Sequence, residues 1–198
     1  MNRLDYFFEN AKGKVLYIGC YMRPPINIAS TYLSLFPSKD MTGLDLVMED
    51  AALNIKKGDA LKPFGVNEYD TIIAGELLEH FDKEEAKVFV SNCWKALKED
   101  GELILTTPNL EALLNRLFHK FDNANCGGFS PHKVLYTIHG IKVFLNDQNF
   151  IVNDLFMLPY DEGSSPDLPK IVYVLRSIMH NFLPDSLREN IVVKARKK

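Results

Sequence analysis

The sequence predicts an α/β protein built on a largely parallel β-sheet, and three observations support this fold class. Short apolar segments alternate with longer segments whose apolar residues recur at helical spacing, as expected for strands joined by crossover helices. Turn glycines, Gly19 and Gly75, directly follow two of the most apolar segments. The chain has 198 residues, of which 46% are hydrophobic. This length and composition suit one domain with a sizeable core.

Seven apolar segments are the expected strands of the sheet. They are Val15–Ile18, Thr42–Leu46, Leu53–Lys57, Tyr69–Ala74, Glu102–Thr107, Phe150–Leu158 and Ile191–Ala195. The regular alternation of strands and helices ends after Thr107, so we expect a parallel sheet in which only the last strand is antiparallel. Helices on both faces would complete a three-layer sandwich of the Rossmann-like type.

Helices are expected between and after these strands. They are Leu4–Phe8, Pro25–Phe36, a helix from Asp82 to about Leu97, one that begins at Asn109, one from Ser130 to Asn149, and Ile171–Phe182. The start at Asp82 is the best marked, because Glu85 three residues later completes a capping box. We expect Ile171–Phe182 to cover the last strands as part of the core. The alternative is a helix that lies on a membrane surface, since it is apolar but contains Arg176 and His180.

Composition and charge disfavour several classes of protein. The formal net charge is −3, whereas a general nucleic-acid binder needs a basic face. No apolar segment approaches the roughly 20 residues needed to span a bilayer, so no stable membrane insertion is expected. Cys20, Cys93 and Cys126 are widely spaced and form no zinc or disulfide pattern. With no signal peptide in Met1–Asn10, we expect a cytoplasmic protein.

Suitable residues stand at the ends of four consecutive predicted strands, namely Gly19, Asp45, Asp59 and Gly75. Ligands of open parallel sheets bind at the carboxyl ends of the strands. A glycine turn lets a ligand approach bare backbone, and the helix that follows adds a partial positive charge. The pattern therefore predicts a cofactor site, while ordinary turn or cap duty remains the simpler explanation for each residue alone.

The order of these parts resembles the class I S-adenosylmethionine-dependent methyltransferases, from about Lys14 to Ala195. Within that class it resembles the branch of ubiquinone-type O-methyltransferases and of sugar or lipopolysaccharide biosynthesis methyltransferases. The matching segments are Val15–Cys20, Gly43–Asp45, Gly58–Ala60, Tyr69–His80, Leu97–Leu103, Phe129–Pro131 and Asn149–Phe150. The resemblance implies S-adenosylmethionine as the cofactor.

At the methionine end of the cofactor, the resemblance implies contacts with Gly19 and with the backbone of Cys20 and Tyr21. Ala74 and Gly75 would form the wall behind the sulfonium. These five residues come from the first and fourth predicted strands and the turns that follow them.

At the nucleoside end, the resemblance implies that Asp45 accepts hydrogen bonds from both ribose hydroxyls. Asp59 would accept one from the adenine amino group, with Ala60 beside it. The chemistry agrees, because a vicinal diol offers two donors and a carboxylate can accept both.

The segment Glu76-x-x-Glu79-His80 follows the fourth strand and supplies the expected catalytic residues, Glu79 and His80. They would act as a general base on an acceptor hydroxyl. A similar Glu-x-x-Glu-His binds a divalent metal in ubiquinone-type O-methyltransferases and in small-RNA methyltransferases. A full site would need a further ligand from His119 or His132. The sequence fixes neither position, so we favour a structural role over a metal site and assign no metal ligands.

We therefore expect one domain, residues 1–198, that transfers a methyl group from S-adenosylmethionine to a small molecule, with oxygen as the acceptor atom. Residues 109–149 would cover the substrate. No nucleic-acid partner is expected, and the oligomeric state is open.

Other functions remain possible. Tyr17, Tyr21 and Arg23 stand where the family prefers an acidic residue and glycines, which keeps open a catalytically inactive binding or scaffold protein. A nicotinamide-dependent dehydrogenase is disfavoured, because Tyr21 and Pro24 replace glycines of the dinucleotide fingerprint. A nucleic-acid methyltransferase is disfavoured by the charge, although Glu76-x-x-Glu79-His80 keeps this function open.

Overall fold

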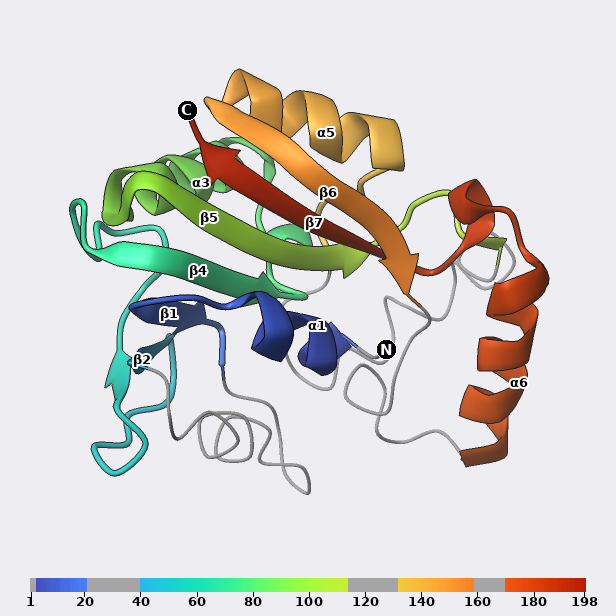
Figure 1. The fold of residues 1–198 in the computed structure, drawn as a ribbon, viewed down its shortest axis with the longest axis horizontal. Coiled ribbons are helices and arrows are strands. Elements are labelled where there is room, and N and C mark those ends of the chain that lie inside the picture. Colours follow the sequence, from blue (N-terminus) through green and yellow to red (C-terminus); the bar gives the residue numbers. More distant parts are fainter. Residues whose placement is uncertain (1–2, 21–39, 114–131, 159–169) are drawn as a thin grey trace.

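The structure, a computed structural model, describes residues 3–20, 40–113, 132–158 and 170–198 (Figure 1). Its elements are α1 (Arg3–Asn10), β1 (Val15–Ile18), β2 (Met41–Asp45), β3 (Ile55–Lys57), β4 (Tyr69–Gly75), η1 (Leu78–His80), α3 (Lys83–Ala96), β5 (Leu97–Pro108), α5 (Ile138–Asp147), β6 (Phe150–Leu158), α6 (Lys170–Phe182), η2 (Asp185–Leu187) and β7 (Asn190–Lys197).

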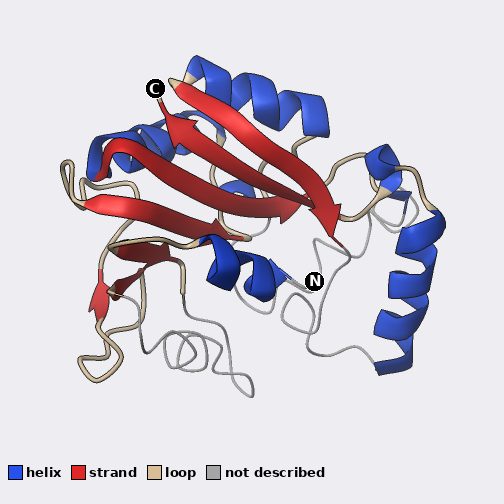
Figure 2. Ribbon diagram, viewed as in Figure 1, coloured by secondary structure: helices blue, strands red, loops and turns tan. Residues whose placement is uncertain are grey.

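The strands form one seven-stranded sheet in the order β3-β2-β1-β4-β5-β7-β6 (Figure 2). Strands β1 to β5 pair in parallel, whereas β7 pairs antiparallel with both β5 and β6. The predicted Rossmann-like sheet with an antiparallel last strand is therefore confirmed. Because β6 and β5 both run opposite to β7, the C-terminal end of β6 lies at the same edge of the sheet as that of β5.

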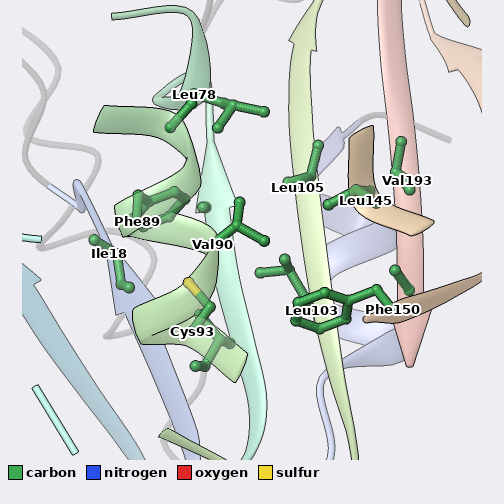
Figure 3. Close-up of a cluster of buried hydrophobic side chains, with 14 of the residues drawn as sticks. Ile18, Leu78, Phe89, Val90, Cys93, Leu103, Leu105, Leu145, Phe150 and Val193 are labelled. Carbon is green, nitrogen blue, oxygen red and sulfur yellow. The ribbon is translucent and has the colours of Figure 1, made fainter. Parts of the chain in front are cut away.

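Alternate residues of the strands pack into two apolar layers. On β1, Leu16 and Ile18 point into the layer under α3 and α5, while Val15 and Tyr17 point into the layer under α1. Figure 3 shows the first layer, where Phe89 of α3 lies beside Ile18. The sheet is thus covered on both faces, as the continuous apolar character of its strands requires.

Most predicted boundaries are within two residues of the observed ones, but two elements begin elsewhere. Strand β5 begins at Leu97 because this residue pairs with Tyr69 before a register shift in the ladder. Helix α5 begins at Ile138, and the prediction of a start at Ser130 is wrong, since residues 132–135 are not helical. Thr137 caps α5 by accepting a hydrogen bond from the Gly140 N–H at 2.9 Å.

The expectation that Ile171–Phe182 forms part of the core is also wrong. Among the side chains of α6 that the structure describes, His180 is buried, whereas six large apolar side chains are exposed. Figure 1 shows α6 standing away from the sheet rather than lying on it.

Two expected helices lie wholly or largely outside the described residues: Pro25–Phe36, and the helix that begins at Asn109. In the described part of the chain, no helix is long and apolar enough to cross a membrane.

The turn into β1 supplies a first prediction. Gly13 has a φ of +60°, and an added Cβ would lie 2.4 Å from Oδ2 of Asp70. That carboxylate accepts hydrogen bonds from the Lys14 N–H at 2.7 Å and from the Lys98 Nζ at 2.8 Å, so it cannot move without breaking them. Gly13→Ala should therefore lower the free energy of unfolding by about 1–3 kcal/mol in urea denaturation. Lys12→Ala, next to it, should change stability little, and equal losses in both variants would contradict the prediction.

Candidate active site at the carboxyl edge of the sheet

The parallel register brings the predicted strand-end residues to one edge of the sheet. Ile18 of β1 lies opposite Leu44 of β2 on one side and Ala74 of β4 on the other. The residues that follow, Gly19 and Asp45, are therefore neighbours across the sheet, and Gly75 lies beyond Gly19. The turn after β3 joins them, because the Gly58 N–H donates to the Asp45 carbonyl at 2.8 Å.

Gly19 is held in a conformation that favours glycine. Its φ is +67°, and its N–H donates to the Leu44 carbonyl at 2.9 Å. The neighbouring Cys20 side chain is buried and packs beneath β2, where an added Cβ on Gly43 would lie 2.8 Å from its Sγ. Burial, followed by the negative charge of Asp45, raises the pKa of the Cys20 thiol to about 12. The thiol is therefore a packing group, and only its backbone suits a ligand contact. Tyr21 lies outside the described residues.

Asp45 is buried, with 6% of its surface exposed, and it holds the turn after β2. Its Oδ1 accepts hydrogen bonds from the Val47 N–H at 3.0 Å and from the Met48 N–H at 3.2 Å. The Asp45 carboxylate therefore has a structural role in this turn. A carboxylate accepts about four hydrogen bonds, so a turn role and a ribose-binding role are compatible.

Asp59 and Ala60 form the turn after β3. Oδ1 of Asp59 accepts from the Leu61 N–H at 2.9 Å, and Nδ2 of Asn92 donates to the Ala60 carbonyl at 3.2 Å. Asn92 belongs to α3 and is buried. Sequence reasoning missed this residue, although a polar side chain between Phe89 and Cys93 on the buried face of α3 was the available signal.

The wall formed by Ala74 and Gly75 is backed by the N-terminal helix. An added Cβ on Gly75 would lie 3.2 Å from Cε2 of Phe7 in α1 and 3.5 Å from the Tyr17 hydroxyl. Phe7 and Tyr17 meet edge to face with ring centroids 6.2 Å apart. Tyr17, which replaces the acidic residue preferred by the resembled family, therefore packs in the apolar layer under α1.

Glu76 follows Gly75 in a left-handed conformation with a φ of +52°. Its N–H donates to the Thr106 carbonyl at 3.0 Å, which fixes the turn against β5. Nη1 of Arg3 lies 3.7 Å from Oε1 of Glu76, and both side chains are largely buried. Arg3 could not be identified from the sequence, because nothing in its spacing connects α1 to the end of β4.

Glu79 is completely buried. Its Oε2 accepts from the Thr107 hydroxyl at 3.1 Å, while its Oε1 is buried without a hydrogen-bond partner among the described residues. Burial, followed by the charge of Glu76, raises the pKa of Glu79 well above the ordinary value of a glutamate. An unpaired carboxylate is costly in such a place, so Glu79 favours either a bound proton or a nearby cation.

Two histidines adjoin this carboxylate. The rings of His80 and His132 meet edge to face with centroids 5.0 Å apart, and one ligand atom from each of Glu79, His80 and His132 lies within 4.8 Å of the others. The N–H groups of Lys133 and Val134 donate to the Glu79 carbonyl at 2.7 and 3.2 Å, which holds the His132 segment in place. The structure thus supplies the third group that the sequence could not locate. His119 lies outside the described residues.

Comparisons with known proteins bear on the fold of the chain. A family model described as a methyltransferase domain matches residues 26–105. A SAM-dependent methyltransferase from Archaeoglobus fulgidus is 19% identical over 98% of this chain and 90% of its own, with a TM-score of 0.64. One from Methanosarcina mazei is 14% identical over 100% and 98%, with a TM-score of 0.65.

A third structure contains ligands. The 1,6-didemethyltoxoflavin-N1-methyltransferase of Burkholderia thailandensis, solved with 1,6-didemethyltoxoflavin and S-adenosylhomocysteine, is 14% identical over 94% of this chain and 72% of its own, with a TM-score of 0.61. No curated protein matches the sequence. At these identities the solved structures establish the fold. The family model covers less than half of the chain, so the comparisons show a chain with the Rossmann-like methyltransferase fold that is similar to the methyltransferase domain family over residues 26–105.

Asp45 supplies the prediction for the cofactor site. Asp45→Ala removes both its turn bonds and its charge, and should weaken S-adenosylhomocysteine binding at least about tenfold, since each charge-assisted hydrogen bond contributes roughly 1.5–3 kcal/mol. Asp45→Asn keeps an oxygen for the Val47 and Met48 N–H groups, so it should preserve the fold and still lose affinity. Calorimetry and thermal unfolding measure the two effects.

Asp59→Ala serves as the comparison, since the adenine contact expected of this residue is a single bond, and it should weaken binding less. If Asp45→Asn bound S-adenosylhomocysteine as tightly as the unchanged protein, Asp45 would hold only the turn.

Proposed function

We propose that this protein transfers the methyl group of S-adenosylmethionine to a hydroxyl oxygen of a small molecule. The observation that carries the proposal is the buried Glu79 with His80 and His132 beside it, one turn beyond the end of β4. A hydroxyl is a weak nucleophile and benefits from a group that removes its proton. The small acceptor is supported by the Burkholderia thailandensis structure, which holds 1,6-didemethyltoxoflavin. A nucleic-acid acceptor is disfavoured by the net charge of −3.

The cofactor supplies a methyl group bound to a positively charged sulfur. The residues proposed to hold it at the carboxyl edge fit its chemistry. The turn at Gly19, with the backbone of Cys20 and Tyr21, and the wall of Ala74 and Gly75 would border its methionine part. Asp45 would hold the ribose, while Asp59 and Ala60 would border the adenine. Two observations support this proposal. The residues that follow β1 and β2 lie at the same edge of the sheet, and Asp45 is a buried carboxylate to which a diol can donate hydrogen bonds.

The proposed proton acceptor is His80, which is half-buried, whereas Glu79 has no exposed surface. As the acceptor oxygen bonds to the methyl carbon and the carbon–sulfur bond breaks, the hydroxyl proton passes to the His80 imidazole. Glu79 would stabilise the imidazolium that results. Much of the remaining rate enhancement would come from holding the oxygen in line with the carbon at roughly 3–3.5 Å.

Residues 109–149 are proposed to cover the acceptor. The two described parts of this segment both adjoin the site. Nδ2 of Asn109 donates to the carbonyls of Ser186 and Arg188 at 2.9 and 2.8 Å, which anchors one end at the sheet edge. The other end carries His132 to the Glu79 carbonyl. We also propose a cytoplasmic location, which the free, buried thiols of Cys20 and Cys93 support.

The catalytic proposal predicts a separation of turnover from cofactor binding. Glu79→Gln and His80→Ala should each lower kcat at least about tenfold and leave the Kd for S-adenosylhomocysteine within about twofold. The expected range is that of general acid–base groups, about 100- to 10,000-fold at its full extent. Kinetics with a panel of phenols, catechols and sugars would measure kcat.

An exposed residue gives the matched control for the glutamate variant. Glu84→Gln on α3 makes the same chemical change as Glu79→Gln at an exposed position and should leave kcat unchanged. Unaltered turnover in both Glu79→Gln and His80→Ala would assign the pair a structural role. If the unchanged protein bound S-adenosylhomocysteine but methylated nothing in the panel, the inactive binding protein would become the favoured function.

Binding of a divalent cation is a second candidate role for the same cluster, whereas the sequence alone favours a structural role. It is favoured by Glu79, whose buried Oε1 has no hydrogen-bond partner among the described residues, and by a carboxylate oxygen of Glu79 that lies within 4.8 Å of a ring nitrogen of each imidazole. One carboxylate and two imidazoles suit zinc or another transition metal better than magnesium or calcium. Such an ion would lower the pKa of a bound hydroxyl.

Metal removal distinguishes the two roles. Under the second candidate, dialysis against a chelator should lower kcat at least about tenfold, and Zn²⁺ or Mn²⁺ should restore it while Mg²⁺ does so less well. His132→Ala should weaken binding of the restoring ion by about 10–100-fold. Full activity in the metal-free protein would exclude the metal role and leave His80 as the proton acceptor.

A further inference from the structure

Helix α6 carries the largest group of exposed apolar side chains among the described residues. Ile171, Val174, Leu175, Ile178, Met179 and Phe182 are all exposed, from 39% for Met179 to 85% for Phe182. Water-soluble domains rarely leave a contiguous group of this kind uncovered, so it marks a surface that meets something else. Figure 1 shows that α6 stands apart from the layers of the sandwich.

The helix is nevertheless attached firmly at its C-terminal end. His180 is buried, and its pKa is lowered mainly by that burial and then by the charge of Arg188. Nε of Arg188 donates to the carbonyls of His180 and Leu183, each at 3.0 Å. The backbone of Arg188 in turn receives a hydrogen bond from Asn109, at the end of β5. Helix α6 is therefore fixed to the carboxyl edge of the sheet, the edge that carries the proposed site.

The six exposed apolar side chains form a broad face of α6. At 100° per residue, the six positions span an arc of about 140° around the helix. A seam between two paired helices is a narrower stripe. A broad arc of large aliphatic and aromatic side chains is the form that suits a flat surface, where the helix lies in the plane of the interface.

The charge of α6 favours contact with an anionic surface. The sequence of α6 contains Lys170 and Arg176 and no aspartate or glutamate, although the whole chain has 26 acidic and 23 basic residues. Two copies paired through this helix would bring like charges together. Anionic lipid headgroups would instead attract it, at about 1 kcal/mol for each cation near the surface.

We propose that the exposed face of α6 binds the surface of an anionic bilayer, with the helix parallel to the membrane plane. Because α6 is attached to the carboxyl edge of the sheet, this contact would hold that edge near the headgroup region, where an amphipathic or lipid-linked acceptor would be presented. Binding of the vesicle surface is independent of methyl transfer. It can therefore be measured whether or not the proposed activity is correct.

A fluorescent reporter tests the contact without disrupting it. The chain has one tryptophan, Trp94, which belongs to α3 and not to α6. The Lys197 Nζ lies over its ring, 4.1 Å from the ring centroid. In a Trp94→Phe background, Phe182→Trp places the only indole on the exposed face. Its emission should shift to shorter wavelength with vesicles of phosphatidylcholine containing 30% phosphatidylglycerol. It should shift much less with phosphatidylcholine alone, and high salt should reverse the shift.

Charge substitutions provide the second measurement. Ile178→Asp with Phe182→Asp should lower co-sedimentation with the anionic vesicles at least about tenfold. Val66→Asp with Val88→Asp makes the same change at exposed positions in a loop and on α3, and should not affect binding. Thermal unfolding of each variant shows that the domain remains folded.

Several results would overturn the proposal. These are the absence of an emission shift at low salt, equal binding to neutral and anionic vesicles, or equal loss in the Val66 and Val88 variant. Sedimentation velocity tests whether a second copy of the chain covers this face instead of a membrane. A dimer that dissociates on Ile178→Asp, in a protein that does not bind vesicles, would show that a second copy covers this face.

Discussion

The pairing of β1 with β2 on one side and β4 on the other is the constraint on which the rest of the structure depends. Ile18 lies opposite both Leu44 and Ala74, so the three strands end at the same level. A slip of one residue would turn every side chain to the opposite layer. It would also separate Gly19 from Asp45 and carry Tyr17 away from Phe7. The same hydrogen bonds therefore hold the core and align the site.

The site departs from the rules that govern the core. Glu79 is an acid buried without full compensation, and Glu76 adopts a left-handed backbone conformation that glutamate rarely takes. Both features lower stability, and both occur directly after β4. The positive charge of Arg3 lowers the pKa of Glu79, but it is the smallest of the influences on that pKa. A loss of stability that is confined to one point of an otherwise well-packed fold is typical of a functional site.

Helix α1, although short, contacts both the core and the candidate site. Phe7 closes the apolar layer behind Gly75, and Arg3 reaches Glu76 from the same helix. The wall behind the proposed sulfonium position and the carboxylates beyond it thus depend on Arg3–Asn10. Removal of this short helix would affect both.

Much of the fold could be predicted from the sequence, because apolar strands, capped helices and glycine turns are local signals. The capping box of Asp82 and Glu85 is present as expected, and β1 and β6 have the predicted bounds. The strand-end residues could also be placed, since a parallel sheet brings carboxyl ends together. Their binding roles remain predictions.

What could not be predicted depends on contacts between distant segments. His132 is 52 residues from His80, and Arg3 is 73 residues from Glu76, so no spacing rule links them. The exposure of α6 was missed for a similar reason. Its apolar periodicity is the same whether a core or an external surface covers it. The start of α5 was misplaced because Ser130-Pro131 is a strong local signal, whereas the N–H groups of Lys133 and Val134 donate to the distant Glu79 carbonyl instead of forming a helix.

Hydrogen exchange with and without S-adenosylhomocysteine tests the central claim most directly, namely that the aligned strand ends form one cofactor site. The account predicts slower exchange at Gly19, at Val47 and Met48, and at Leu61, because these N–H groups hold the turns after β1, β2 and β3. All three turns should respond together at saturating ligand, while β6 and β7 remain unchanged. Protection confined to β6 and β7, or no protection at millimolar ligand, would contradict it.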